Sequence, residues 1–171
     1  GVIPRVVADQ TPIYKHRLSI DDVTERLQVF YYPYHAKLTS LIKQTRDSFK
    51  KVILLDCHSM PNSAITIAKN RDPVEVVLGD CFGTSCEPEI VMELKDLLTE
   101  VGFKVSLNKP FSGGFITRNY ANPPNNIYVI QIEILRSLYS YEKQQTKNSE
   151  FLAIQNRLLG AIEQFIERFE D

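Results

Sequence analysis

The sequence predicts an α/β fold in three layers, with helices on both faces of a mainly parallel sheet. Short β-branched runs alternate along the chain with stretches of helical periodicity. The runs are apolar at consecutive positions, which is typical of strands buried on both faces. With 171 residues, the chain is long enough for one sizeable core, so we expect a single domain over residues 1–171.

The helical half of the pattern begins after an irregular arm at residues 1–18. Ser19 and Asp22 form a variant of the capping box, which predicts a helix start. An apolar stripe of helical period then runs to about residue 49. Pro33 lies inside this stripe and predicts a kink or two helices.

The strand pattern begins next, and its elements alternate with loops and one helix. In order they are a strand at 51–56, a loop at 57–71, a strand at 75–78, a loop at 81–87, a helix from near Pro88 to Gly102, and a strand at 103–107. A Gly-, Asn- and Pro-rich loop is expected at 109–124, followed by the most apolar strand at 127–135. Ser149 is expected to cap a final helix with an apolar inner face.

Net charge, hydropathy and cysteine content limit the kinds of partner and the cellular compartment that we expect for this protein. The formal net charge of −1 gives no reason to expect nucleic acid or an anionic membrane as a partner. We see no apolar run of membrane-spanning length and no signal peptide. Cys57, Cys81 and Cys86 are an odd number without Cys-x-x-Cys spacing, which favours a reducing cytoplasm over a disulfide framework or a cysteine zinc cluster. The oligomeric state is not predicted.

A carboxylate and an imidazole follow the first apolar run. Strand alternation places Asp56 and His58 on one face and Cys57 on the other, which disfavours a Cys57–His58 dyad. Ligands bind beyond the carboxyl ends of strands in open parallel sheets, so the pair suggests a metal or acid–base site. The alternative is that His58 is a hydrogen-bonded loop residue.

The last apolar strand carries a carboxylate. Gln131 and Glu133 point to one face of the predicted strand, whereas the neighbouring isoleucines point to the other. A buried carboxylate is costly unless it is paired or functional. Glu133 therefore either belongs to a site near His58, if both strands run parallel, or forms an ion pair with Arg136 or Arg118.

Two further loops carry polar candidates. Asp80 follows the second strand and is expected at the same sheet edge, either as a functional carboxylate or as an Asx-turn residue. Gly113 and Gly114 allow close backbone approach to a ligand. Arg118 after them can offer a planar fork to a carboxylate, although a lone loop Arg is usually a solvated charge.

Taken together, these stretches resemble one family, the N-formylglutamate amidohydrolases, in four motifs that occur in the same order. They are Asp56-Cys-His-Ser-Met-Pro61, Gly79-Asp80 followed by Gly83-Thr-Ser-Cys86, Gly113-Gly-Phe-Ile-Thr-Arg118, and Gln131-Ile-Glu-Ile134 with Leu138-Tyr139. The resemblance implies a zinc carboxypeptidase-like fold and hydrolysis of N-formylglutamate to formate and glutamate, which would place the protein in bacterial histidine degradation.

The resemblance also implies roles for single residues. His58 would bind one zinc ion, and Glu133 would be the general base. Asp56 and Asp80 would not bind the zinc themselves but would orient the residues that do. Arg118 would hold a carboxylate of a small N-acyl amino acid substrate.

Thr117 and the backbone of Gly113 and Gly114 would shape the substrate pocket.

Three departures from the family pattern bear on this interpretation. The family's other metal ligands are expected upstream of Gly1, so the chain is interpreted as an N-terminally truncated member that supplies only His58 of the family ligands, unless Asp56 or Asp80 substitutes. We therefore expect the chain itself to bind zinc weakly and to be inactive. Cys81 stands where an Arg is common, and Leu135 where an Asn is common. Two alternatives stay open: a zinc carboxypeptidase-like amidase acting on another acyl-amino acid or peptide, and a non-catalytic binding domain that retains the fold.

Overall fold

The computed structural model describes residues 2–7, 10–66 and 74–169. The chain divides into two compact units, Gly1–Gln44 and Thr45–Asp171, and the boundary falls within helix α2.

The first unit is an irregular arm followed by an interrupted helix. Helix α1 (Ile20–Arg26) begins as predicted, because the Ser19 hydroxyl accepts from the Asp22 backbone N–H and the Asp22 carboxylate accepts from the Ser19 backbone N–H. A π-helical turn, η1 (Leu27–Tyr31), separates it from α2 (Tyr32–Phe49). Pro33 is the second residue of α2, so the predicted interruption is confirmed and lies just before the proline.

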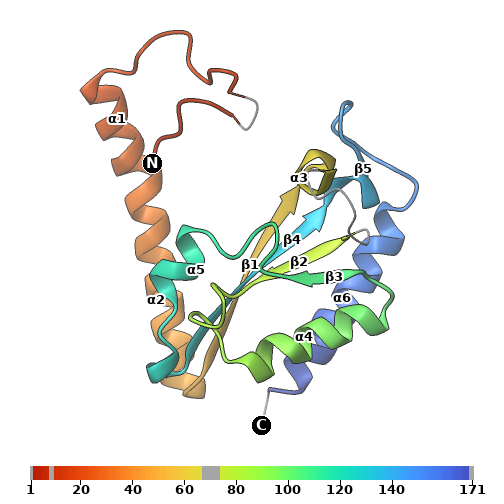
Figure 1. Ribbon diagram of the computed structural model, residues 1–171. Helices are drawn as coiled ribbons and strands as arrows, with labels where there is room; N and C mark the ends of the chain where they lie inside the picture. The colour runs from red at the N-terminus through yellow and green to blue at the C-terminus, as the bar shows by residue number, and fades with distance from the viewer. Residues whose placement is uncertain (1, 8–9, 67–73, 170–171) are drawn as a thin grey trace. The chain divides into compact units, whose positions relative to one another are not determined.

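The second unit is built on a four-stranded sheet in the order β1-β4-β2-β3 (Figure 1). The strands are β1 (Val52–Met60), β2 (Val76–Gly79), β3 (Val105–Leu107) and β4 (Ile127–Leu135). Strand β1 runs parallel to β4, and β2 runs parallel to β3, whereas β2 and β4 are antiparallel. The predicted mainly parallel α/β sheet is confirmed, with one antiparallel step at its centre.

Helices cover both faces of this sheet. Helices α4 (Pro88–Glu100) and α6 (Phe151–Glu167) pack together on one face, over Tyr128, Ile130 and Ile132 of β4, and form the main apolar core (Figure 1). The short helix α5 (Phe115–Tyr120) contacts β4 from the other face, where Gln131 and Glu133 point. The odd and even residues of β4 thus serve different purposes, one set filling the core and the other reaching a polar site.

The first strand is longer than predicted. It continues through Asp56 and His58 to Met60, because β4 offers it a parallel partner as far as Leu135. Part of the predicted loop at 57–71 is therefore strand, and a further part is helix α3 (Asn62–Thr66); residues 67–71 lie outside the described part of the chain.

Two other predictions of local structure are wrong. The predicted loop at 109–124 contains α5, so the Thr117–Arg118 pair is helical. Ser149 does not cap α6: the N-cap is Glu150, no side chain caps that helix end, and the Ser149 hydroxyl donates to the Glu150 carboxylate. Smaller elements complete the unit: η2 (Pro123–Asn125), η3 (Arg136–Leu138), β5 (Ser140–Tyr141) and β6 (Thr146–Lys147).

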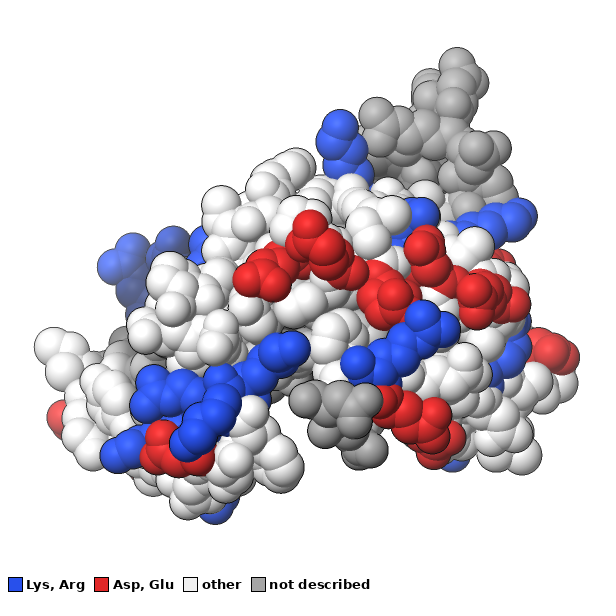
Figure 2. Space-filling model, turned by 90° about the horizontal axis from the view of Figure 1, so that it is seen from below, with Lys and Arg blue, Asp and Glu red and all other residues white. Residues whose placement is uncertain are grey.

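The surface carries charges of both signs. On the face drawn in Figure 2, Lys and Arg side chains lie beside Asp and Glu side chains, and neither sign covers the face. Among the described residues, no helix is long and apolar enough to cross a membrane.

Candidate active site

The carboxyl halves of β1 and β4 bring the predicted polar residues together. In the parallel register His58 lies opposite Glu133, and Asp56 lies opposite Gln131. These four residues alternate with their strand neighbours and therefore share one face of the sheet. The prediction that Glu133 lies beside His58 is confirmed in position, and it depends on the parallel pairing of two strands far apart in sequence.

His58 and Asp56 are in direct contact. The His58 Nε2 atom lies 3.1 Å from Asp56 Oδ1, and the imidazole is about half exposed whereas Asp56 is 14% exposed. This contact orients the ring and leaves Nδ1 as the nitrogen that can bind another group. The second oxygen, Asp56 Oδ2, is buried and has no hydrogen-bond partner among the described residues.

Glu133 is a buried carboxylate held by an amide. Gln131 Nε2 donates to Glu133 Oε1 at 3.0 Å, and both side chains are buried. Burial is the main cause that raises the pKa of Glu133, the Asp56 carboxylate raises it further, and the charges of His58 and Arg136 oppose the shift. A carboxylate with a raised pKa beside an imidazole suits proton transfer near neutral pH.

The alternative of a buried ion pair for Glu133 is not found among the described residues. Arg136 instead donates from Nε to Ser59 Oγ and from Nη2 to the Ser59 carbonyl, both at 3.1 Å. Arg118 donates from Nη1 to the Gly113 carbonyl at 3.0 Å. Arg136 directly follows β4, and from there its charge acts on Glu133 although the two side chains form no ion pair.

The Gly113–Gly114 turn packs directly onto the sheet. A Cβ on Gly79 would lie 2.7 Å from the Gly113 nitrogen, and a Cβ on Gly113 would lie 2.7 Å from Cys81 Sγ. Gly113 also has a φ of +127°, which side-chain-bearing residues rarely adopt. The glycines of this turn therefore permit close contact with β2 and β4.

Helix α5 presents the predicted substrate-binding residues. Thr117 is fully buried, and its Oγ1 accepts from the Gly114 N–H at 3.2 Å, so it fixes the turn. Arg118 is exposed on the same helix and uses one guanidinium nitrogen on Gly113. Its other donors are able to form the two-pronged contact that a carboxylate accepts.

Asp80 does not lie at the edge where it was predicted. Because β2 is antiparallel to β4, Gly79 pairs with Gln131 and the chain then runs away from Glu133. Asp80 is buried there, and its Oδ1 accepts from Asn108 Nδ2 at 2.6 Å while its backbone N–H donates to Asn108 Oδ1. It stabilises the turn after β2 and is not beside His58.

A complete metal site is not formed by the described residues. No group of three or more His, Cys, Asp or Glu side chains among them is placed to hold a metal ion. His58, Asp56 and Glu133 offer one imidazole and two carboxylates, with His58 and Asp56 already in contact with each other.

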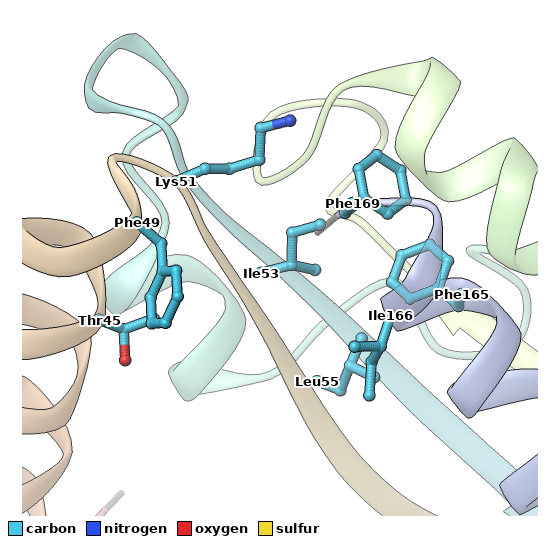
Figure 3. Close-up of a pocket in the computed structure, with 8 residues that line it drawn as sticks. All are labelled: Thr45, Phe49, Lys51, Ile53, Leu55, Phe165, Ile166 and Phe169. Atoms are coloured by element: carbon cyan, nitrogen blue, oxygen red, sulfur yellow. The ribbon is translucent and has the colours of Figure 1, made fainter. Parts of the chain in front are cut away.

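A pocket of about 760 Å³ lies on the other face of β1, toward α6 (Figure 3). Ile53 and Leu55 of β1 line it together with phenylalanines of α6 and its C-terminal end, and Lys51 Nζ lies 5.2 Å from the centre of the Phe169 ring. The lining contains no His, Asp or Glu among the described residues, and its one charged side chain is Lys51.

Comparison with known proteins gives one consistent family. The profile of N-formylglutamate amidohydrolase matches residues 1–140. An N-formylglutamate deformylase of Pseudomonas putida is 30% identical over 156 residues, covering 90% of this chain and 58% of that protein. The Pseudomonas aeruginosa deformylase is 27% identical over 146 residues, covering 84% of this chain and 54% of that protein.

A solved structure of the same kind is also similar. The crystal structure of N-formylglutamate amidohydrolase from Ralstonia eutropha matches with a TM-score of 0.86 and 34% identity, over 96% of this chain and 61% of that one. The chain therefore spans less than two thirds of the length of each of these relatives.

Proposed function

Because the chain belongs to the N-formylglutamate amidohydrolase family, we propose that the protein containing it is a hydrolase that converts N-formylglutamate to formate and glutamate. The observation that carries the proposal is the register pair His58–Glu133. It places a buried carboxylate with a raised pKa beside an imidazole, within a sheet whose fold matches that of an amidohydrolase of this name.

The chemistry assigned to Glu133 is a proton relay. Glu133 would take a proton from the attacking water as the water oxygen bonds to the formyl carbon. It would then pass the proton to the nitrogen of the substrate as the C–N bond breaks, releasing formate and the amine of glutamate. Its raised pKa supports both steps, because the carboxyl group must gain and lose a proton in each cycle.

Substrate orientation is assigned to α5. Arg118 would bind a carboxylate of the substrate, and its Nη1 bond to Gly113 supports this role by limiting where the guanidinium can point. Thr117 would act by accepting a hydrogen bond from the Gly114 N–H. This bond fixes the turn that precedes α5, the helix that carries Arg118.

Zinc is the proposed cofactor, with His58 as one ligand. The contact between His58 Nε2 and Asp56 supports this, because metal-binding histidines usually direct their other ring nitrogen to a carboxylate or carbonyl. Catalytic zinc takes about three protein ligands, so the remaining ligands would come from outside the described residues. When bound, zinc would polarise the formyl carbonyl.

The test is formate release by the full-length protein that contains this chain. Glu133→Gln keeps the size of the side chain but cannot accept a proton, so kcat should fall by about 100-fold or more. The matched control is Glu163→Gln on the exposed side of α6, which should behave as wild type. Wild-type protein that releases no formate from N-formylglutamate contradicts the substrate; a Glu133→Gln variant with full activity contradicts the role of the carboxylate.

A further inference from the structure

The buried side-chain amide of Gln131 lies between Glu133 and the Gly113–Gly114 turn. Gln131 is 5% exposed, sits in the middle of β4, and points to the same face as Glu133. Its Nε2 donates to Glu133 Oε1 at 3.0 Å. A buried amide needs partners for its other atoms as well, so the surroundings of its carbonyl oxygen matter.

The other end of this amide lies against the glycine turn. A Cβ on Gly114 would be 3.1 Å from Gln131 Oε1, closer than ordinary contact. Gly114 has a φ of −94° and a ψ of −155°, an extended conformation open to any residue. The missing side chain at this position therefore provides space for the amide rather than conformational freedom.

The turn that Gln131 contacts is also the start of the substrate-binding helix. Gly114 is the N-cap of α5, its N–H donates to Thr117, and its neighbour Gly113 accepts from Arg118. A displacement of the turn would thus reach Arg118 through α5 and Glu133 through Gln131. The amide thus lies between the Gly113–Gly114 turn and the Glu133 carboxylate.

We infer that Gln131 is a positioning residue, which couples the Gly113–Gly114 turn to Glu133 and fixes the direction of that carboxylate. By engaging Oε1 it leaves Oε2 for the reacting water. The inference rests on the proposed role of Glu133 as the base. It assigns Gln131 no contact with the substrate, so its loss should change the rate of the chemical step more than substrate binding.

The first experiment replaces the amide in the full-length protein. Gln131→Met keeps the length of the side chain and removes its hydrogen bonds, and kcat should fall by about 10- to 100-fold, the range for a hydrogen bond to a charged group. KM for N-formylglutamate should stay unchanged, because Arg118 is untouched. Gln155→Met, the same exchange at an exposed position of α6, is the control.

The second experiment asks whether the turn acts through the amide. Gly114→Ala should lower kcat in the wild-type background, because the added Cβ pushes on Gln131. Gln131→Asn shortens the side chain so that it reaches neither neighbour, and adding Gly114→Ala to it should cause no further loss. Thermal unfolding of each variant checks that it is folded.

The outcomes separate the inference from the proposed function. Unchanged kcat in Gln131→Met, a change in KM alone, or an equal effect of Gly114→Ala in both backgrounds overturns the positioning role. Loss of formate release in Glu133→Gln together with full activity in Gln131→Met leaves the proposed function standing and removes only the inference. Full activity in Glu133→Gln removes the function on which it rests.

Discussion

Replacing Gly79 by Ala should destabilise the protein by a predictable amount. The added Cβ would lie 2.7 Å from both the Gly113 nitrogen and the Ser112 carbonyl carbon, which are backbone atoms and cannot rotate away. The segment is also tied down, because the Cys81 N–H donates to the Ser112 carbonyl at 2.6 Å. Relief of the clash therefore requires the turn to lift from the sheet.

The magnitude follows from two costs. Overpacking a tight contact costs about 1–3 kcal/mol, and loss of the Cys81 hydrogen bond adds about 1 kcal/mol. The sum is about 2–4 kcal/mol. With an unfolding entropy of about 2.1 cal/mol/K per residue and 171 residues, the entropy is about 0.36 kcal/mol/K, so Tm should fall by about 6–11 °C.

The assay is thermal unfolding followed by circular dichroism, with Gly160→Ala as the matched control. A Cβ on Gly160 meets no atom within 4 Å and lies inside α6, so this exchange should stabilise the protein slightly, by about 0.5–1 kcal/mol. A Tm of Gly79→Ala within about 1 °C of wild type would refute the close packing of the turn on β2.

Three other predictions concern stability and metal binding. Glu133→Gln should raise Tm at pH 7, measured without metal, because burial raises the pKa of Glu133 above 4.5 and its ionised form therefore costs stability. The gain in Tm should fade below pH 4.5, where Glu133 is protonated in both the folded and the unfolded state. Equal Tm values of variant and wild type at pH 7 would contradict this prediction. Arg157→Met should cost about 2 kcal/mol in urea unfolding, since Arg157 donates to the Val101 carbonyl at 2.8 Å and covers the Phe103 ring at 4.1 Å. The 171-residue chain alone should bind zinc weakly through His58, and stoichiometric zinc that survives dialysis would oppose this.

The positions of the strands along the chain could be predicted from the sequence, but the relative orientation of neighbouring strands could not be predicted for every pair. β-Branched runs mark β2, β3 and β4 within one or two residues. A run such as Val76–Gly79 is equally apolar in either orientation, so nothing in it indicates that β2 opposes β4. That single reversal moves Asp80 away from the site, since a residue that follows a strand lies at the edge to which the strand points.

The shared face of the polar residues could be predicted, because side chains alternate between the two faces along each strand. Helix α5 could not be predicted. Alternation alone places Asp56 with His58 and Gln131 with Glu133. Helix α5 is only six residues long and starts after two glycines, so it has too few residues for a helical period to be recognised. The packing of Gln131 against the Gly114 backbone depends on which turn approaches β4, and that approach is tertiary structure without a sequence signal.

The pairing of β1 with β4 also has a kinetic consequence. Val52 pairs with Ile127, a separation of 75 residues, and every pair in this ladder has the same separation. The contact of Gly114 with Gln131, by comparison, spans 17 residues. Contacts between distant segments carry a larger loop-closure cost and slow folding. During refolding, Glu133, Gln131 and the Gly113–Gly114 turn should therefore assemble before His58 joins them, and the activity proposed for the full-length protein should return later than the helical signal.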